Sequence, residues 1–161
     1  MIIQHKGNLF ERLEFVKEFA EPNAVHVIVH GCNAQGKMRS GFAKELRQRY
    51  PGAYDAYMEQ HNNGGLKLGA VVYYDTDDDM LIANAITQEF FGYDGAKYVS
   101  YDAIHTSFSV MNTVLTTLNR PVYLHFPKIG ADLGGGNWNV IEKIIDETVT
   151  NPLIQKHLYI L

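Results

Sequence analysis

The stretch that decides the fold is VHVIVHGCNAQGKMRSGFAKELRQRY, residues 25–50. It opens with apolar, mostly β-branched residues at positions 25–29, a run that is typical of a buried strand. His30, Cys32 and Asn33 follow at the carboxyl end of this strand. A loop with three glycines then leads into a helical pattern, an order that presents backbone N–H groups and a helix dipole to an anion. The same stretch is equally compatible with a tight strand-to-helix connection that binds nothing.

A second glycine loop, PKIGADLGGGN at residues 127–137, also follows an apolar strand and precedes a helical pattern. Ligands of open α/β sheets bind beyond the carboxyl ends of the strands, so two such loops side by side would clamp a diphosphate. Neither loop has the GxGxxG or Walker A sequence, so an NAD or NTPase site is not indicated. Asp132 lies in the second loop and His30 at the first. A histidine at a strand end is either structural or an acid, base or phosphate partner.

The composition is typical of a globular protein and gives no sign of a membrane-spanning segment. The 161 residues are 46% apolar and carry a formal net charge of −4, which predicts one domain over residues 1–161 and argues against a broad nucleic-acid surface. The single cysteine excludes an internal disulfide framework and favours a reducing, cytoplasmic setting. The sequence has neither a run of about 18 apolar residues nor a signal-peptide pattern at its start. We therefore expect a cytoplasmic monomer with no membrane partner.

Hydrophobic periodicity predicts six strands with helices between them. Ser40 is expected to cap a helix whose residue Leu46 faces the core. Residues 53–61 are expected to form a further helical turn or two. Ser100 is expected to cap a long helix with a buried stripe from Ile104 to Leu118. The segment from Leu68 to Ile86 is expected to form a hairpin. The expected fold is a three-layer α/β/α sandwich on a mixed, about six-stranded sheet. The strands are expected at residues 1–5, 25–29, 68–74, 80–86, 121–126 and 157–161.

The acidic run at residues 75–79 lacks the pattern of a calcium-binding loop, and we interpret it as a solvated hairpin turn. Nothing else in the sequence indicates a metal ion or a cofactor.

Four segments, in sequence order, resemble the macro domain family of ADP-ribose-binding modules. Together they extend over almost the whole chain, which makes a chance similarity of short motifs improbable. The branch that they resemble contains ADP-ribose-1''-phosphate phosphatases and glutamyl-ADP-ribose hydrolases. The resemblance implies a macro domain fold and ADP-ribose, or a derivative of it, as the ligand. The segments are KGNLF at residues 6–10, HGCNAQGKMRSGFAKELRQRYP at 30–51, ITQEFFGYDGAKYVSYDAI at 86–104 and FPKIGADLGGGNWNVIEKII at 126–145.

The resemblance also implies particular binding residues. Asn8 stands where an aspartate usually accepts the adenine amino group, and its amide oxygen would be an uncharged acceptor there. Asn33 matches the asparagine that bonds the distal ribose. The two loops would enclose the ligand largely through their backbone. The implied ligand-binding residues are Asn8, Leu9, Asn33, Ser40, Gly41, Phe42, Gly130, Ala131, Leu133, Gly134, Gly135, Gly136 and Asn137.

The chemistry implied by the resemblance depends on the branch. The phosphatase branch carries a histidine just before its Cys-Asn motif, a position that His30 fits, and Asp132 is the candidate acidic partner. The hydrolase branch has a catalytic lysine and aspartate where Asp75 and Gly134 stand here, so its mechanism is not implied. We therefore expect an ADP-ribose-1''-phosphate phosphatase with His30 and Asp132 as catalytic residues. The alternatives are a non-catalytic ADP-ribose reader and a hydrolase that removes mono-ADP-ribose from protein or nucleic acid.

Overall fold

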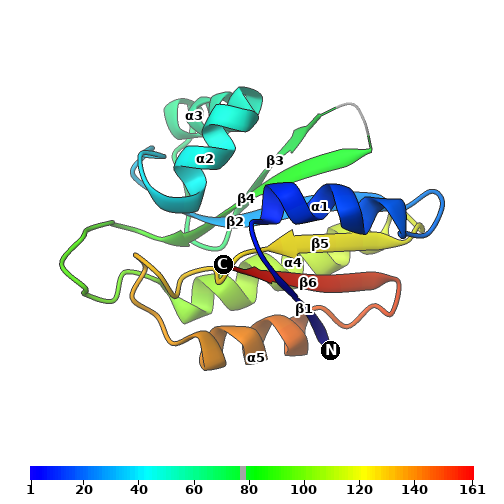
Figure 1. Cartoon of the computed structure of the whole chain (residues 1–161). Helices are drawn as coiled ribbons and strands as arrows, with labels where there is room; N and C mark the ends of the chain where they lie inside the picture. Colours follow the sequence, from blue (N-terminus) through cyan, green and yellow to red (C-terminus); the bar gives the residue numbers. More distant parts are fainter. Residues whose placement is uncertain (77–78) are drawn as a thin grey trace.

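The computed structural model describes residues 1–76 and 79–161. Within them, six strands form one sheet in the order β1-β6-β5-β2-β4-β3 (Figure 1). Every neighbouring pair is parallel except β3 and β4, which form the predicted antiparallel hairpin. The expected mixed sheet is therefore confirmed. The strands are β1 (Ile2–Lys6), β2 (Val25–Asn33), β3 (Val71–Asp75), β4 (Met80–Gln88), β5 (Val122–Phe126) and β6 (Ile154–Ile160).

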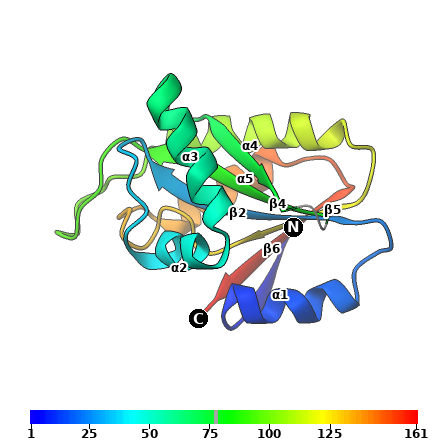
Figure 2. The ribbon, with the colours of Figure 1, turned by 90° about the horizontal axis from the view of Figure 1, so that it is seen from above.

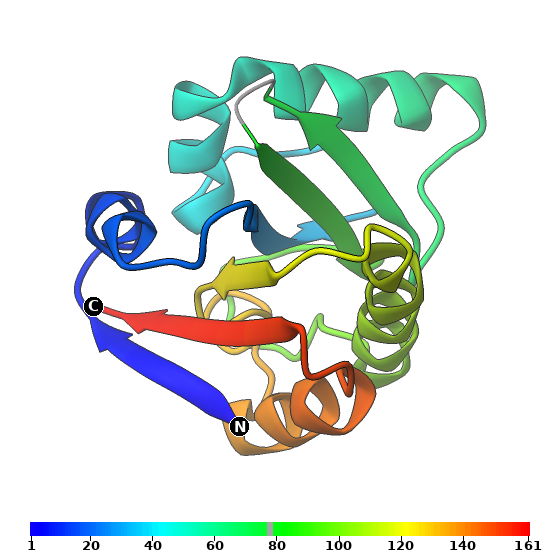
Figure 3. The same ribbon diagram turned by 90° about the vertical axis from the view of Figure 1, so that its right-hand side faces the viewer.

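Helices cover both faces of the sheet, which gives the three layers that the sequence predicts. Helices α1, α2 and α3 lie on one face, and α4 and α5 lie together on the other (Figures 2 and 3). Within the described ranges, no helix combines the length and the apolar character needed to cross a bilayer. The helices are α1 (Leu9–Glu18), α2 (Gly41–Arg49), α3 (Pro51–Asn63), α4 (Tyr101–Thr116) and α5 (Trp138–Thr148).

Strand β2 lies inside the sheet and is buried along nearly its whole length. Val25, Val27 and Val29 point to the core beneath α4 and α5, whereas Ile28 points to the core beneath α1 and α2. A parallel strand that is covered on both faces has to be apolar on both. This explains why every residue from Val25 to Val29 except His26 is apolar. The strand continues to Asn33, four residues beyond the predicted end.

Several predicted boundaries are corrected by the structure. Pro51 begins α3 instead of lying before it, because the first position of a helix does not need the N–H group that proline lacks. The cap at Ser100 is confirmed, with its hydroxyl accepting from the N–H of Ala103 at 3.1 Å. Leu118 lies beyond the end of α4 and is 39% exposed, so the buried stripe ends at Leu115. Strand β6 starts three residues earlier than predicted. Asp77 and Asp78 of the acidic run lie outside the described residues.

Four histidines lie side by side on the sheet face that α1 covers. Nδ1 of His26 is 2.9 Å from Nε2 of His125, and Nε2 of His5 is 2.8 Å from Nδ1 of His157. Burial lowers the pKa of all four rings, to about 4 for His157. Neutral rings can share protons along such pairs, so the cluster satisfies polar groups inside the core. In the described part of the chain, no group of three or more His, Cys, Asp or Glu side chains is arranged to hold a metal ion.

Candidate functional site

A pocket of about 640 Å³ lies where the parallel strands β1, β2, β4, β5 and β6 reach their carboxyl ends. The segments that follow β2, β4 and β5 (residues 34–40, 89–98 and 127–137) gather beyond this edge, at the left of Figure 1. Ligands of α/β sheets bind at this edge, and small-molecule pockets commonly have volumes of about 300–1,000 Å³. The pocket therefore has the place and the size of a small-molecule site.

The structure brings most of the predicted site residues together in this pocket. Gly135, Gly136 and Asn137 are outside its lining. The backbone of Gly136 packs closely on Val99, and the side chain of Asn137 caps α5 by accepting from the N–H of Asn139 at 2.9 Å. The predicted residues that do line the pocket are Asn8, Leu9, His30, Asn33, Ser40, Gly41, Phe42, Gly130, Ala131, Asp132, Leu133 and Gly134.

The two glycine loops face each other across the pocket. A Cβ atom placed on Gly41 would lie 3.8 Å from Cδ1 of Leu133, and the φ of +61° at Gly41 is one that favours glycine. In the second loop, the N–H groups of Asp132, Leu133 and Gly134 make no hydrogen bond within the described residues. Those of Ala131, Gly135 and Gly136 are bonded to carbonyls of the loop itself. Consecutive unpartnered N–H groups are well suited to hold an anion.

His30 lies at the floor of the pocket and is 1% exposed. Its Nε2 is 2.5 Å from the side-chain oxygen of Asn84. Burial lowers the pKa of His30 to about 4, although the bond to Asn84 acts in the opposite direction. The ring is therefore neutral at pH 7. The thiol of Cys32, 3.4 Å from the same nitrogen, has its pKa raised by burial and is not a thiolate nucleophile.

Asn33 holds the first glycine loop in place. Its side-chain oxygen accepts from the N–H groups of Gln35 and Lys37, at 3.0 and 3.3 Å, and its backbone carbonyl accepts from the hydroxyl of Tyr57 at 2.6 Å. Its amide nitrogen donates to the carbonyl of Lys37 at 2.9 Å. An amide group has two N–H donors, so one of them remains to face a ligand.

Ser40 is the N-cap residue of α2, as predicted, and its side chain also connects two loops. Within the described residues its hydroxyl makes no capping bond to α2, although the residue occupies the N-cap position. It lies 2.9 Å from the hydroxyl of Tyr93, a residue of the segment after β4. Tyr93 and Phe91 both line the pocket although they are 65% and 40% exposed.

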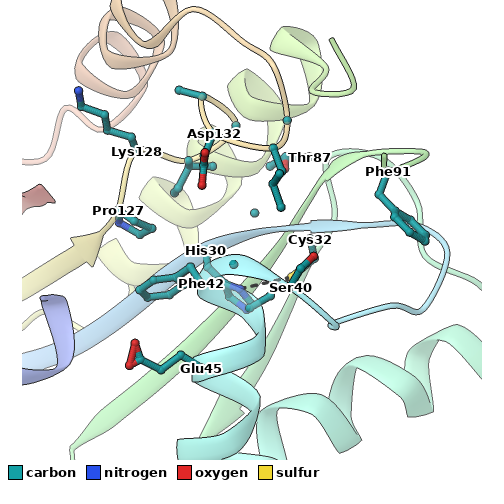
Figure 4. A pocket seen from close by; sticks show the side chains of 18 of the residues that line it. His30, Cys32, Ser40, Phe42, Glu45, Thr87, Phe91, Pro127, Lys128 and Asp132 are labelled. Atoms are coloured by element: carbon teal, nitrogen blue, oxygen red, sulfur yellow. Dashed lines mark hydrogen bonds between the residues drawn. The ribbon is translucent and has the colours of Figure 1, made fainter. Parts of the chain in front are cut away.

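Figure 4 shows how the side chains divide the pocket into two ends. Phe42 and Glu45 of α2 lie at one end with Pro127, and Phe91 lies at the other. His30 lies between them on the floor, and Asp132 projects from the second glycine loop above. The arrangement suits an elongated ligand whose middle faces the glycine loop.

Sequence reasoning missed several lining residues. Glu45 and Thr87 line the pocket, and so does the end of the chain from Tyr159 to Leu161. Asp75 pairs with Leu81 at the opposite end of β4 from the pocket, so matching it to a catalytic lysine was wrong. The polar pattern at the end of β4 was the available signal for Thr87, whereas the terminal residues offered none.

No family model matches the chain. It is 31% identical over 124 residues to a protein described as an uncharacterized 17.5 kDa protein in the tk-vs intergenic region of Enterobacteria phage T4. The alignment covers 74% of this chain and 77% of the phage protein. The chain belongs to the family of this phage protein.

Solved structures extend the comparison over the whole chain. A protein of unknown function from Bacteroides thetaiotaomicron has a TM-score of 0.83 and 27% identity, covering 100% of this chain and 98% of its own. A macrodomain protein from Streptomyces coelicolor has a TM-score of 0.77 and 26% identity, covering 99% and 98%. Thermosipho africanus DarTG, solved in complex with ADP-ribose, has a TM-score of 0.71 and 16% identity, covering 84% of this chain and 38% of that one. The fold of this chain is that of the macro domains.

Proposed function

We propose that this chain binds ADP-ribose, or a derivative of it, in the pocket at the carboxyl edge of the sheet. The observation that carries the proposal is the pair of facing glycine loops, one of which leaves three consecutive N–H groups without a partner among the described residues. The proposal is supported by the macro domain fold and by the ADP-ribose bound to the structurally similar Thermosipho protein.

The diphosphate of such a ligand belongs beside the second loop. The N–H groups of Asp132, Leu133 and Gly134 would bond its oxygens, and the first turn of α2 at Gly41 and Phe42 contributes the positive end of a helix dipole from the other side. The two riboses and the base then extend to the two ends of the pocket. Asn33 retains one amide N–H for a ribose hydroxyl.

Calorimetric titration with ADP-ribose tests the proposal, with one matched pair of variants. A Cβ atom at Gly134 would lie 2.7 Å from the carbonyl oxygen of Gly130, so Gly134→Ala must reshape the loop and should weaken binding about tenfold or more. Gly64→Ala makes the same change where the nearest atom is a flexible side-chain end at 3.4 Å, and should bind like wild type. Thermal unfolding verifies that both variants fold. A wild-type protein that gives no binding heat and no thermal shift with ADP-ribose would overturn the proposal.

Hydrolysis of ADP-ribose-1''-phosphate is a second candidate function. It is favoured by one observation, that His30 of β2 and Asp132 of the second glycine loop line the same pocket. Because the pKa of His30 is about 4, its ring would act as a base or a hydrogen-bond partner at neutral pH, and not as the acid that protonates the leaving oxygen. The loop N–H groups would hold the charge of the transferring phosphoryl group.

Phosphate release separates this activity from binding alone. Wild-type protein, Asp132→Asn and His30→Gln are incubated with ADP-ribose-1''-phosphate. The phosphatase proposal requires release by wild type that both variants lower sharply. Release no faster than in a protein-free sample, together with calorimetric binding, would leave the chain as a reader. Protein or nucleic acid carrying mono-ADP-ribose serves as the parallel substrate, and an acceptor that stays modified would reject the third alternative, removal of mono-ADP-ribose.

A further inference from the structure

Asn8 and Glu45 meet at the end of the pocket that Phe42 lines. The amide nitrogen of Asn8 donates to Oε1 of Glu45 at 3.3 Å. Both residues line the pocket, yet they are far apart in sequence, Asn8 before α1 and Glu45 on α2. Glu45 lies three residues after Phe42 and hence on the same helix face. Figure 4 shows the side chains of Phe42 and Glu45 at this end.

The side-chain oxygen of Asn8 is already engaged by α1. It accepts from the N–H groups of Phe10 and Glu11, at 2.9 and 3.4 Å, as the cap of the helix. An amide oxygen has two lone pairs, so these two bonds use its capacity. Asn8 consequently presents only N–H donors to its surroundings. An acceptor for a ligand at this end has to come from another residue.

Glu45 supplies that acceptor. Its side chain is 36% exposed, and its second oxygen accepts from Nε of Arg49 at 3.4 Å. A carboxylate offers about four lone-pair sites, and the bonds from Asn8 and Arg49 use two of them. The Arg49 guanidinium itself lies over the ring of Phe10, 4.7 Å from its centre, which holds the ion pair in place.

The neighbouring backbone adds a donor to this acceptor. Leu9 follows Asn8, lines the pocket, and has an N–H group that bonds to nothing in the described part of the chain. A heterocycle with an amino group beside a bare ring nitrogen, as in the 6-aminopurine edge, offers the complementary donor and acceptor. In a 6-oxopurine the donor and the acceptor exchange places, so the carbonyl of the base would face the carboxylate.

Charge assigns the orientation of the ligand. A carboxylate repels phosphate, so the diphosphate cannot lie at the Glu45 end and belongs beside the N–H groups of the second glycine loop. A neutral ring can lie at the Glu45 end, where Phe42 offers an aromatic surface.

We propose that Glu45 reads the base of the nucleotide: its carboxylate accepts from the exocyclic amino group, and the pocket thereby selects adenine over 6-oxopurines. The inference rests on the proposed binding of ADP-ribose and adds the residue that sets its base specificity. In place of an acidic residue at position 8, the negative charge comes from α2.

Two ligands and three proteins test this role. Calorimetry measures the affinities of ADP-ribose and of inosine 5'-diphosphate ribose, in which a carbonyl replaces the amino group. Each nucleotide is titrated into wild type, Glu45→Gln and Glu59→Gln. Wild type should prefer ADP-ribose. An amide at position 45 can turn its N–H donors toward the carbonyl, so Glu45→Gln should lower the preference about tenfold. Glu59 is an exposed residue of α3 outside the pocket lining, and Glu59→Gln should keep the wild-type preference.

The outcomes separate this inference from the proposed function. If wild type binds ADP-ribose and Glu45→Gln keeps the wild-type preference, the role of Glu45 is rejected and ADP-ribose binding stands. If wild type binds neither nucleotide, ADP-ribose binding is rejected and the role of Glu45 with it. Thermal unfolding of Glu45→Gln verifies that a changed preference does not arise from a misfolded protein.

Discussion

The side-chain oxygen of Asn84 accepts a hydrogen bond from Nε2 of His30, beneath the floor of the pocket. The amide of Asn84 is oriented by its own nitrogen, which donates to the carbonyl of Ala53 at 3.1 Å. Because the oxygen therefore faces His30, the proton of the neutral imidazole lies on Nε2 and Nδ1 is left as an acceptor. A residue of β4 and a carbonyl of α3 thus determine the tautomer of a histidine on β2.

Replacing Asn84 should be costly because the residue is fully buried and serves two partners. Asn84→Ala leaves the buried Nε2–H of His30 without its acceptor and removes the side-chain bond to the carbonyl of Ala53, and we expect a loss of about 3 kcal/mol in the free energy of unfolding. Urea denaturation measures it. Asn62→Ala, on the exposed side of α3, is the control and should change stability by less than about 0.5 kcal/mol. A loss at position 84 no larger than at position 62 would contradict the tautomer argument.

The histidine cluster should make the protein sensitive to acid. Burial, and then the charges that His5 and His26 would carry, lower the pKa of His157 from 6.5 to about 4. Below pH 6.5 the unfolded chain binds a proton at this residue that the folded chain does not, so stability falls as the pH falls from 6.5 toward 4. For His157 alone the loss reaches about 3 kcal/mol at pH 4.

Denaturation at pH 7.5 and at pH 5 measures this dependence. His157→Gln removes one of the histidines whose pKa is lowered. The stability of this variant should therefore fall less between the two pH values than that of wild type. His105→Gln, on the exposed side of α4, should retain the wild-type dependence. If all three proteins lose the same stability on acidification, the cluster is not the cause.

The hydrogen bond between Ser40 and Tyr93 should restrain the segment at residues 89–98. Both side chains are at the mouth of the pocket, and their hydroxyl oxygens are 2.9 Å apart. Tyr93→Phe should increase amide hydrogen exchange in this segment while global stability changes by less than about 0.5 kcal/mol. The Ser40→Ala variant and the double variant complete a cycle, in which the double variant should exchange no faster than either single one. Strictly additive effects would show that the two hydroxyls act independently.

Gly31 should not tolerate a side chain while Thr87 is present. A Cβ atom at Gly31 would lie 2.7 Å from the hydroxyl oxygen of Thr87 and 3.1 Å from a methyl of Ile129. We expect Gly31→Ala to cost about 1–3 kcal/mol of stability. The Thr87 hydroxyl is buried with no partner among residues 1–76 and 79–161, so its loss forfeits no hydrogen bond there. Adding Thr87→Ala should therefore restore part of the stability, and a double variant less stable than Gly31→Ala would contradict the packing argument.

Much of the fold could be predicted because it follows from local patterns. The apolar run at the start of β2, the cap at Ser100 and the hairpin of β3 and β4 each depend on residues that are close in sequence. Boundaries were less predictable, since proline at position 51 is compatible both with the end of one helix and with the start of the next.

The site was predictable in part for the same reason. The two glycine loops could be identified, and the structure brings Gly41 and Leu133 to face each other. The N-cap position of Ser40 was predictable, but the partner of its hydroxyl was not, because the N-terminus of α2 and Tyr93 compete for it and only the folded chain decides between them.

A mixed α/β sheet with two loops suited to bind an anion follows from the amino-acid sequence alone, because hydrophobic period and glycine placement act over a few residues. Which polar groups those loops meet depends on how distant segments pack in the folded chain. His30 is neutral because burial excludes solvent from its ring, and Asn84 then determines which ring nitrogen carries the proton. The carboxylate of Glu45 stands beside Asn8 because α2 packs against the start of α1. Such pairings arise where segments far apart in the chain are buried together, and burial sets both the partner and the charge of each group.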